Sequence, residues 1–206
     1  TKTATEENFV TDLDLNFIRI PASEFTMGSK RALDRQAHDD EMPAQVLQVS
    51  DYFIMKYPVT NAQYRRFVRE TGHRAPLSWH NGDFPPGKEN HPVVGVSYSD
   101  ALAFCAWASQ VTGQPVRLPT EPEWEKAARG ATPRVYPWGD GWSKGLCNSS
   151  EEKLNGTTPV DQFSPQGDSP YGIADTGGNV QGWCSSLFGP YPYDPTDGRE
   201  ALVYSL

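Results

Sequence analysis

The sequence predicts an α+β domain with low regular secondary structure, about three short helices and several short antiparallel strands. Three helical patterns carry their own start and stop signals, and short apolar runs of strand character precede them. The 206 residues include 18 Gly and 18 Pro, while 12% of the residues are aromatic. This composition favours a turn-rich fold whose core is filled by large rings.

The predicted strands lie in the first quarter of the chain. Residues 17–20 alternate as a strand does, 21–23 provide a turn, and 25–27 form a second short strand. The polar, charged stretch 29–43 is expected to be a loop. Residues 45–56 are β-branched and alternating enough to pair as strands.

The first helix is predicted to begin at Thr60. Thr60 and Gln63 have the spacing of a capping box, in which each side chain accepts a hydrogen bond from a free N–H at the helix start. Gly72 supplies the stop, because glycine readily adopts the left-handed conformation that ends helices. The buried face is predicted to comprise Tyr64, Phe67, Val68 and Thr71.

The second helix is predicted to begin near Ser99 and Asp100 and to end at Gly113. Its side chains follow the helical repeat. The buried stripe is predicted to comprise Ala101, Leu102, Cys105 and Ala108.

The third helix is predicted to begin at a second capping box, Thr120 with Glu123, and to end at Gly130. Glu125 is expected to be exposed to solvent or to pair with Arg129 four residues on. The inward-facing residues are predicted to be Trp124, Ala127 and Ala128.

Residues 131–206 show almost no periodicity. Long irregular segments are uncommon in compact domains, so this stretch is expected to need internal ties, either aromatic packing or bound ions. No internal repeat and no clear linker interrupts the sequence. A single domain over 1–206 is the simplest prediction.

Charge and hydropathy exclude two classes of partner. The net charge is −8 and no basic stripe is present, so a nucleic-acid partner is not expected. No stretch reaches the roughly 20 apolar residues of a membrane helix, so no membrane partner is expected. Residues 1–9 are polar and have no apolar signal core, which predicts a cytoplasmic or an already processed extracytoplasmic protein.

Several short motifs occur in one order along most of the chain, and together they resemble the formylglycine-generating enzyme, or sulfatase-modifying factor, family. The most specific runs from Arg117 to Gly130 and is nearly the full family signature. The others are Phe25-Thr26-Met27-Gly28, Pro58-Val59-Thr60-Asn61, His91-Pro92-Val93-Val94, Tyr136-Pro137-Trp138-Gly139, Thr158-Pro159-Val160 and Gly178-Asn179-Val180.

The resemblance implies a C-type-lectin-like α+β fold. This fold is shared by formylglycine-generating enzymes, by the C-terminal domain of ergothioneine-type sulfoxide synthases and by variable proteins of diversity-generating retroelements. Fold and function therefore have to be argued separately.

The family's activity is the oxidation of a cysteine in a sulfatase Cys-x-Pro/Ala-x-Arg motif, with Cu⁺ held by two cysteines. Thiolates are soft ligands that select Cu⁺. The family's copper cysteines lie near an "RGGSW" segment, which this sequence lacks, and no cysteine follows Cys184. The resemblance thus implies that the C-terminal catalytic segment is missing, so no catalytic or cofactor-binding residue is assigned.

The three cysteines Cys105, Cys147 and Cys184 are interpreted as structural. Their odd number rules out a complete disulfide framework, and one disulfide between Cys147 and Cys184 is left open. Because the family's missing strands would complete a sheet, an unpaired sheet edge through which the chain associates is also expected.

The family also binds structural calcium, which takes six to eight oxygen ligands from flexible loops. In the first site the resemblance assigns side-chain oxygens of Asn148 and Glu152 and carbonyls of Ser149 and Leu154. In the second site it assigns the Asp175 carboxylate and the carbonyls of Gly178 and Val180. The alternative for both sites is that these segments are ordinary polar turns.

The second site departs from the family pattern. The family usually has "GNVWEW", in which the Glu is a ligand, whereas this chain has Gln181 and Gly182 in place of the Trp and the Glu. The loss of one carboxylate should weaken that site.

Three functions are consistent with these observations. The favoured one is a family domain without independent catalysis, either a binding module for a protein or peptide or a truncated enzyme. The alternatives are a formylglycine-generating oxidase acting on a sulfatase cysteine, and a ligand-binding display protein of the diversity-generating-retroelement type.

Overall fold

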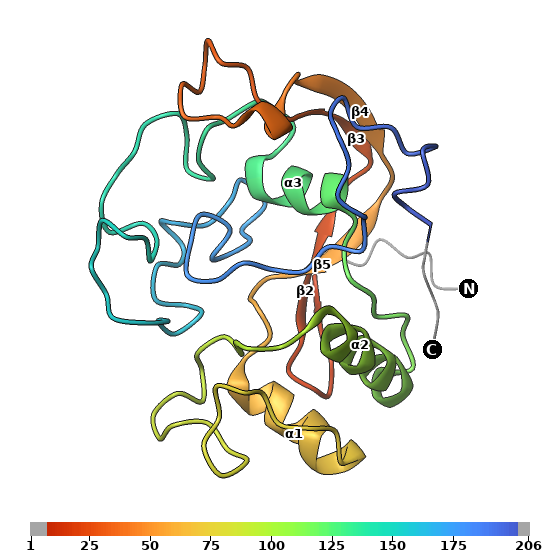
Figure 1. Cartoon of the computed structure of the whole chain (residues 1–206), viewed down its shortest axis with the longest axis vertical. Coiled ribbons are helices and arrows are strands. Elements are labelled where there is room, and N and C mark those ends of the chain that lie inside the picture. Colours follow the sequence, from red (N-terminus) through yellow and green to blue (C-terminus); the bar gives the residue numbers. More distant parts are fainter. Residues whose placement is uncertain (1–7, 202–206) are drawn as a thin grey trace.

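A computed structural model describes residues 8–201 and confirms the α+β prediction. All helices and strands of this part precede residue 130, and irregular chain makes up the rest (Figure 1). The strands are β1 (Phe9–Val10), β2 (Asn16–Ile20), β3 (Ser23–Met27), β4 (Gln45–Val49) and β5 (Tyr52–Met55). The helices are a short 3-10 turn, η1 (Asp39–Glu41), and α1 (Asn61–Thr71), α2 (Tyr98–Thr112) and α3 (Glu121–Arg129).

The strands form two small antiparallel sheets. One has the order β1-β2-β5, with Phe17 opposite Met55, and the other pairs β3 with β4, with Phe25 opposite Leu47. The predicted pairing segment 45–56 is thus divided between the two sheets, because β4 and β5 separate at residues 50–51. The sequence predicted that these strands form, but it did not predict which strands pair with each other.

All three long helices begin with a complete capping box. The capping residues are Thr60, Ser97 and Thr120, and each accepts a hydrogen bond from the N–H three residues on. The prediction for the second helix was therefore wrong by about one residue. Ser97 is its cap, and Asp100 is the reciprocal partner within the first turn.

The prediction that Thr71 and Trp124 face inward was also wrong. Thr71, in the last turn of α1, is exposed, and Trp124 on α3 is 36% exposed. On α2, Cys105 and Ala108 are buried as expected, while Ala101 and Leu102 are half-buried. The core of α2 is made by Phe104 and Trp107 instead, since they meet the rings of α1.

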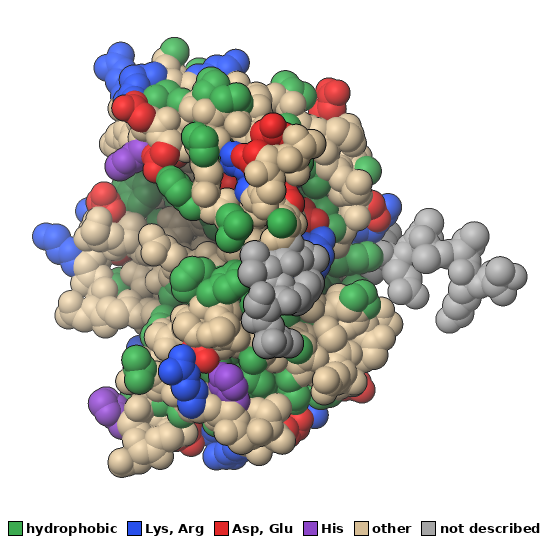
Figure 2. All heavy atoms as spheres, turned by 45° about the vertical axis from the view of Figure 1, so that its right-hand side comes forward, with side chains coloured by type: hydrophobic (Ala, Val, Ile, Leu, Met, Phe, Trp, Pro, Cys, Tyr) green, Lys and Arg blue, Asp and Glu red, His purple; other side chains and the backbone are tan. Residues whose placement is uncertain are grey.

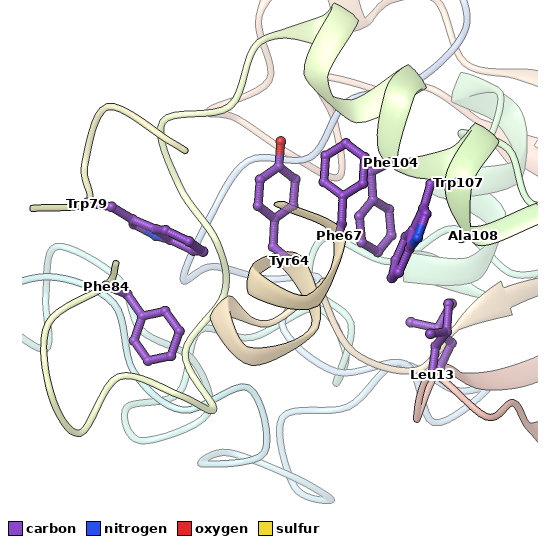
Figure 3. Packing of buried hydrophobic residues seen from close by; sticks show 9 residues of the cluster. Leu13, Tyr64, Phe67, Trp79, Phe84, Phe104, Trp107 and Ala108 are labelled. Carbon is purple, nitrogen blue, oxygen red and sulfur yellow. The ribbon is translucent and has the colours of Figure 1, made fainter. Parts of the chain in front are cut away.

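The main hydrophobic core is aromatic, as the composition predicted. Tyr64 and Phe67 of α1 face Phe104 and Trp107 of α2, with ring centroids 5.5 to 5.7 Å apart in stacked, edge-on and tilted arrangements (Figure 3). Trp79 packs edge-on against Tyr64 at 6.1 Å. Such pairs add to the stability that burial of the rings already provides.

Lys126 on α3 is completely buried, which the sequence did not predict. Its Nζ donates to the carbonyl oxygens of Pro21 at 2.6 Å and Ser23 at 3.3 Å, and lies 3.5 Å from that of Val49. A buried ammonium is tolerated when its donors are satisfied. Lys126 thereby fixes α3 to the turn between β2 and β3 and to the end of β4.

Glu125 and Arg129 on the same helix form the i+4 pair that the sequence suggested, at 2.6 Å. The alternative of a solvent-exposed Glu125 is wrong, since its side chain is only 14% exposed. Glu125 also accepts the N–H of Gly28 at 2.8 Å, and burial raises its pKa. The pair joins α3 to the chain just after β3.

Between residue 130 and residue 201 the structure contains no helix or strand. Tyr136, Trp138 and Trp142 pack on one another there, with centroids 5.4 to 5.9 Å apart. Figure 2 shows one face of the molecule, on which acidic, basic and hydrophobic side chains are interspersed. Within residues 8–201 no helix is both long and apolar enough to span a bilayer.

Candidate functional site

The two segments predicted to bind calcium lie against each other in the irregular half. The Asn148 side chain donates to Asn179 Oδ1 at 3.1 Å, and the Asn179 N–H donates to the Asn148 carbonyl at 2.8 Å. Gly178 packs directly on this carbonyl, because a Cβ at Gly178 would lie 2.5 Å from the Asn148 oxygen. The predicted sites are therefore neighbours in space.

Asn179 organises this junction. Its side chain accepts the N–H of Thr158 at 2.9 Å and donates to the Thr158 carbonyl at 3.1 Å and to Asp175 Oδ2 at 2.8 Å. Its φ of 69° is in the left-handed region, which asparagine tolerates better than most residues. This role of Asn179 was not predicted from the sequence, although the Gly-Gly-Asn run before Val180 indicates a turn.

Asp175 is a carboxylate held in an unfavourable environment. Burial raises its pKa to about 6, the hydrogen bond from Asn179 opposes the shift, and the negative charges of Asp168 and Asp161 add to it. Within residues 8–201 no cationic side chain forms an ion pair with Asp175. A cation at this point would favour the charged carboxylate.

Two buried hydroxyls near Asp175 lack hydrogen-bond partners among the described residues. They are Thr158 Oγ1 and Thr176 Oγ1. Thr176 follows Asp175 in the chain, and the Thr158 backbone is bonded to Asn179. Unpaired buried oxygens are costly in a native protein unless water or an ion satisfies them. The second predicted site thus offers a carboxylate and unsatisfied oxygens, which fit a hard cation such as Ca²⁺.

The residues of the first predicted site are engaged in local turns. Glu152 Oε1 accepts the N–H of Gly145 at 2.9 Å. The Ser149 carbonyl accepts the N–H of Glu152 at 3.2 Å, and the Leu154 carbonyl accepts that of Gly156 at 3.0 Å. Each carbonyl oxygen keeps a second lone pair.

Cys147 connects the two sites electrostatically. Burial raises the pKa of its thiol, and the carboxylates of Glu152, Glu151 and Asp175 raise it further. The structure thus gathers negative charge from both predicted sites around one residue. Nevertheless, residues 8–201 contain no group of three or more His, Cys, Asp or Glu side chains that could hold a metal. Most ligands of a bound ion would have to be carbonyl, amide and hydroxyl oxygens.

All three cysteines are free, so the disulfide between Cys147 and Cys184 that the sequence left open is not formed. Burial raises the pKa of Cys105 to about 11, while burial and then nearby glutamates raise that of Cys184 to about 12. Cu⁺ needs thiolates. Cys105 on α2 and Cys147 are buried, Cys184 is half-buried, and Cys147 and Cys184 lie in separate loops, so the sequence segments that hold the thiols do not provide the paired thiolates that Cu⁺ calls for.

Comparison with known proteins gives a family match over nearly the whole chain. The model of the sulfatase-modifying factor enzyme 1-like domain matches residues 3–204. The chain is 31% identical to mouse formylglycine-generating enzyme over 90% of this chain and 64% of that protein. It is also 31% identical to bovine inactive C-alpha-formylglycine-generating enzyme 2, over 84% of this chain and 71% of that protein.

Among solved structures, PvdO from Pseudomonas aeruginosa is similar, with a TM-score of 0.71 at 25% identity. The similarity covers 92% of this chain and 77% of that one. The chain spans less than two thirds of the length of the mouse protein. The similar proteins include one named as an enzyme and one named as inactive, so similarity alone does not decide catalysis.

Proposed function

The chain belongs to the sulfatase-modifying factor enzyme 1-like family, and from this premise we propose that it is a calcium-stabilised, protein-binding family domain without independent oxidase activity. The observation that carries the proposal is the state of its thiols. Cys105 and Cys147 are buried and Cys184 is half-buried, burial raises the pKa of all three thiols, and the three come from separate segments. Redox chemistry with Cu⁺ calls for paired thiolates.

A peptide assay tests this proposal directly. The full chain is incubated with Cu⁺, oxygen and a peptide that contains Cys-x-Pro-x-Arg, and mouse formylglycine-generating enzyme serves as the positive control. We expect the mass of the peptide to be unchanged by this chain and reduced by the control. Conversion of the peptide cysteine to formylglycine by this chain would contradict the proposal.

Binding is measured separately from conversion. Because the family is described as sulfatase-modifying, the same peptide with Cys replaced by Ser is labelled and titrated with the chain. Saturable binding without conversion supports a peptide-binding module.

A second mode of partner contact is pairing through the exposed edge of a sheet. It predicts concentration-dependent dimers in size-exclusion chromatography.

The second candidate function is the oxidase itself. It is favoured by the 31% identity to mouse formylglycine-generating enzyme over 90% of this chain. The third, a ligand-binding display protein, draws on a solved structure of similar fold, the Treponema denticola variable protein 1, at 19% identity and a TM-score of 0.70. The C-type-lectin-like description and the compartment stay predictions.

We propose that Ca²⁺ binds at the two predicted sites, which adjoin where residues 148–154 meet residues 175–180. The first would take side-chain oxygens of Asn148 and of Glu152, if Glu152 releases Gly145, and the carbonyls of Ser149 and Leu154. The second would take the Asp175 carboxylate and the carbonyls of Gly178 and Val180. The orphaned Thr158 and Thr176 hydroxyls and the raised pKa of Asp175 support this proposal. Ca²⁺ would contribute fold stability here and no chemical step.

Melting curves with Ca²⁺ and with a chelator test the calcium proposal. A ligand that binds only the folded chain must raise the melting temperature. We expect Ca²⁺ to raise it and the chelator to reverse the rise. Identical curves under both conditions would remove calcium from the proposal without affecting the peptide assay.

A further inference from the structure

A hollow lies away from the junction of the predicted calcium sites, between the loop that follows β3 and the chain that leaves α3. It is shallow, and its empty volume of about 300 Å³ includes open solvent. We call it the Arg129 hollow. Its charged and hydroxyl-bearing lining residues include Ser29, Lys30, Asp34, Arg129, Arg134 and Asp140.

Arg129 is fixed in place by three hydrogen bonds. Nε donates to the Arg134 carbonyl at 2.7 Å, and Nη1 donates to the Gly28 carbonyl at 2.8 Å and to Glu125 at 2.6 Å. The side chain is only 16% exposed. A guanidinium held this firmly loses little further freedom when it binds a ligand.

The remaining nitrogen of this guanidinium, Nη2, has no hydrogen-bond partner among residues 8–201 and is not sealed from solvent. Arg129 lines the hollow, and an arginine Nη2 carries two N–H donors. The structure therefore leaves a preorganised cationic donor group without an acceptor. An acceptor that carries negative charge would form the strongest hydrogen bond with it.

Two neighbours add positive charge to the hollow, and a third adds a hydroxyl. Lys30 and Arg134 line it, and within the described residues neither side chain forms an ion pair. The Ser29 hydroxyl, from a residue only 8% exposed, also lacks a hydrogen-bond partner among residues 8–201. Ser29 is held by its N–H, which donates to the Glu41 carbonyl at 2.7 Å.

Two carboxylates limit what the hollow can accept. Asp34 accepts the N–H of Gln36 at 2.9 Å, and Asp140 accepts that of Val135 at 3.4 Å. Both keep their negative charge close to a bound anion, and the repulsion grows with the charge of the ligand. This favours a singly charged anion over a doubly charged one.

We propose that the Arg129 hollow binds the carboxylate group of a small molecule. Arg129 Nη2 donates to one carboxylate oxygen, the Ser29 hydroxyl contributes a second donor, and Lys30 and Arg134 supply positive charge at the rim. This site is independent of the calcium proposal and of the question of oxidase activity, because it shares no residue with either.

Isothermal titration of the full chain at fixed ionic strength, with acetate and with inorganic phosphate as probes, tests the proposal. We expect saturable binding of acetate, and weaker binding of phosphate. Arg134→Gln should weaken acetate binding about tenfold, which corresponds to about 1.4 kcal/mol. Ser29→Ala should weaken it without changing the charge.

Arg69→Gln is the matched control, because it removes the same charge from the exposed surface of α1. It should leave acetate binding unchanged. The proposal is overturned if acetate does not saturate, if phosphate binds more tightly, or if Arg69→Gln weakens binding as much as Arg134→Gln. Circular dichroism of each variant confirms that the fold is kept, and Lys30→Gln provides a second charge variant if Arg134→Gln unfolds.

Discussion

The part of the molecule before residue 130 and the part after it hold their shape by different means. The first contains the sheets and the capped helices around an aromatic core. The second has no helix or strand up to residue 201, and side chains bond to its backbone instead. In the first part, the stability that comes from apolar burial is distributed over many contacts. In the second part, a few polar side chains hold the backbone, so stability depends strongly on each of them.

This difference has a functional consequence. The proposed calcium sites and the Arg129 hollow all include residues from the irregular part of the chain. Irregular chain can direct several carbonyl and side-chain oxygens toward one point. The Arg129 hollow lies where the two parts meet, because Glu125 and Arg129 of α3 bond to Gly28 and Arg134. The ordered part supplies rigid donors, and the irregular part supplies the shape around them.

The largest expected effect is in the aromatic core. Phe67→Ala removes a side chain that is 2% exposed and contacts Tyr64, Phe104 and Trp107. We expect a loss of about 3–5 kcal/mol in the free energy of unfolding, because the cavity cannot fully collapse. Urea denaturation measures it. A loss below about 1 kcal/mol would mean that the core is not the main source of stability.

Lys126 tests the connection between α3 and the sheets. Lys126→Ala removes a fully buried side chain and leaves the Pro21 and Ser23 carbonyls without their donor. We expect a loss of about 2–4 kcal/mol, measured by urea denaturation. Lys126→Met keeps most of the volume but not the donors. If Met restores full stability, the hydrogen bonds contribute little and packing alone explains the effect.

Asn179 tests the irregular half. Asn179→Ala removes bonds to Thr158, Asp175 and Asn148 and places alanine at a φ of 69°. We expect a loss of about 2–3 kcal/mol, since buried partners are left unsatisfied and alanine is strained there. Asn155→Ala, at an exposed position, is the control and should change stability little. Hydrogen exchange should show the loss of protection mainly after residue 130. A uniform loss of protection would mean that the two parts are not stabilised separately.

Asp175 gives the smallest expected effect and links stability to pH and calcium. Its pKa is raised to about 6 in the folded chain, so its contribution to stability is fully present below about pH 4 and is lost as the pH rises through 6. Asp175→Asn removes the charge and suits the left-handed φ of 58°. Without calcium, we expect this variant to be about 1–2 kcal/mol more stable than the parent at pH 7 and no more stable at pH 4.

Asp175→Asn should also abolish the rise in melting temperature that we expect Ca²⁺ to cause in the parent protein. Gly182→Glu, which restores the carboxylate that the family pattern has there, should increase that rise. If Asp175→Asn responds to Ca²⁺ as the parent does, Asp175 is not a ligand. Calorimetric melting curves at pH 7, with and without Ca²⁺, compare all three chains.

Local signals in the sequence were sufficient to predict most helices and strands of the part before residue 130. The capping boxes at Thr60 and Thr120, the stops at Gly72 and Gly113, and the strands at 17–20 and 25–27 all occur in the structure. These features depend on residues within a few positions of one another. The motifs in their fixed order likewise identified the family, which the match over residues 3–204 shows.

Contacts between distant residues decided what the sequence could not. Trp124 lies partly exposed and Lys126 lies buried because the carbonyls of Pro21 and Ser23, about a hundred positions away in sequence, face α3. The role of Asn179, the free state of Cys147 and Cys184, and the unpaired Nη2 of Arg129 depend in the same way on how the irregular chain returns to the ordered half. Periodicity reports a residue's neighbours along one helix or strand, whereas burial and charge pairing depend on which other segments pack against it.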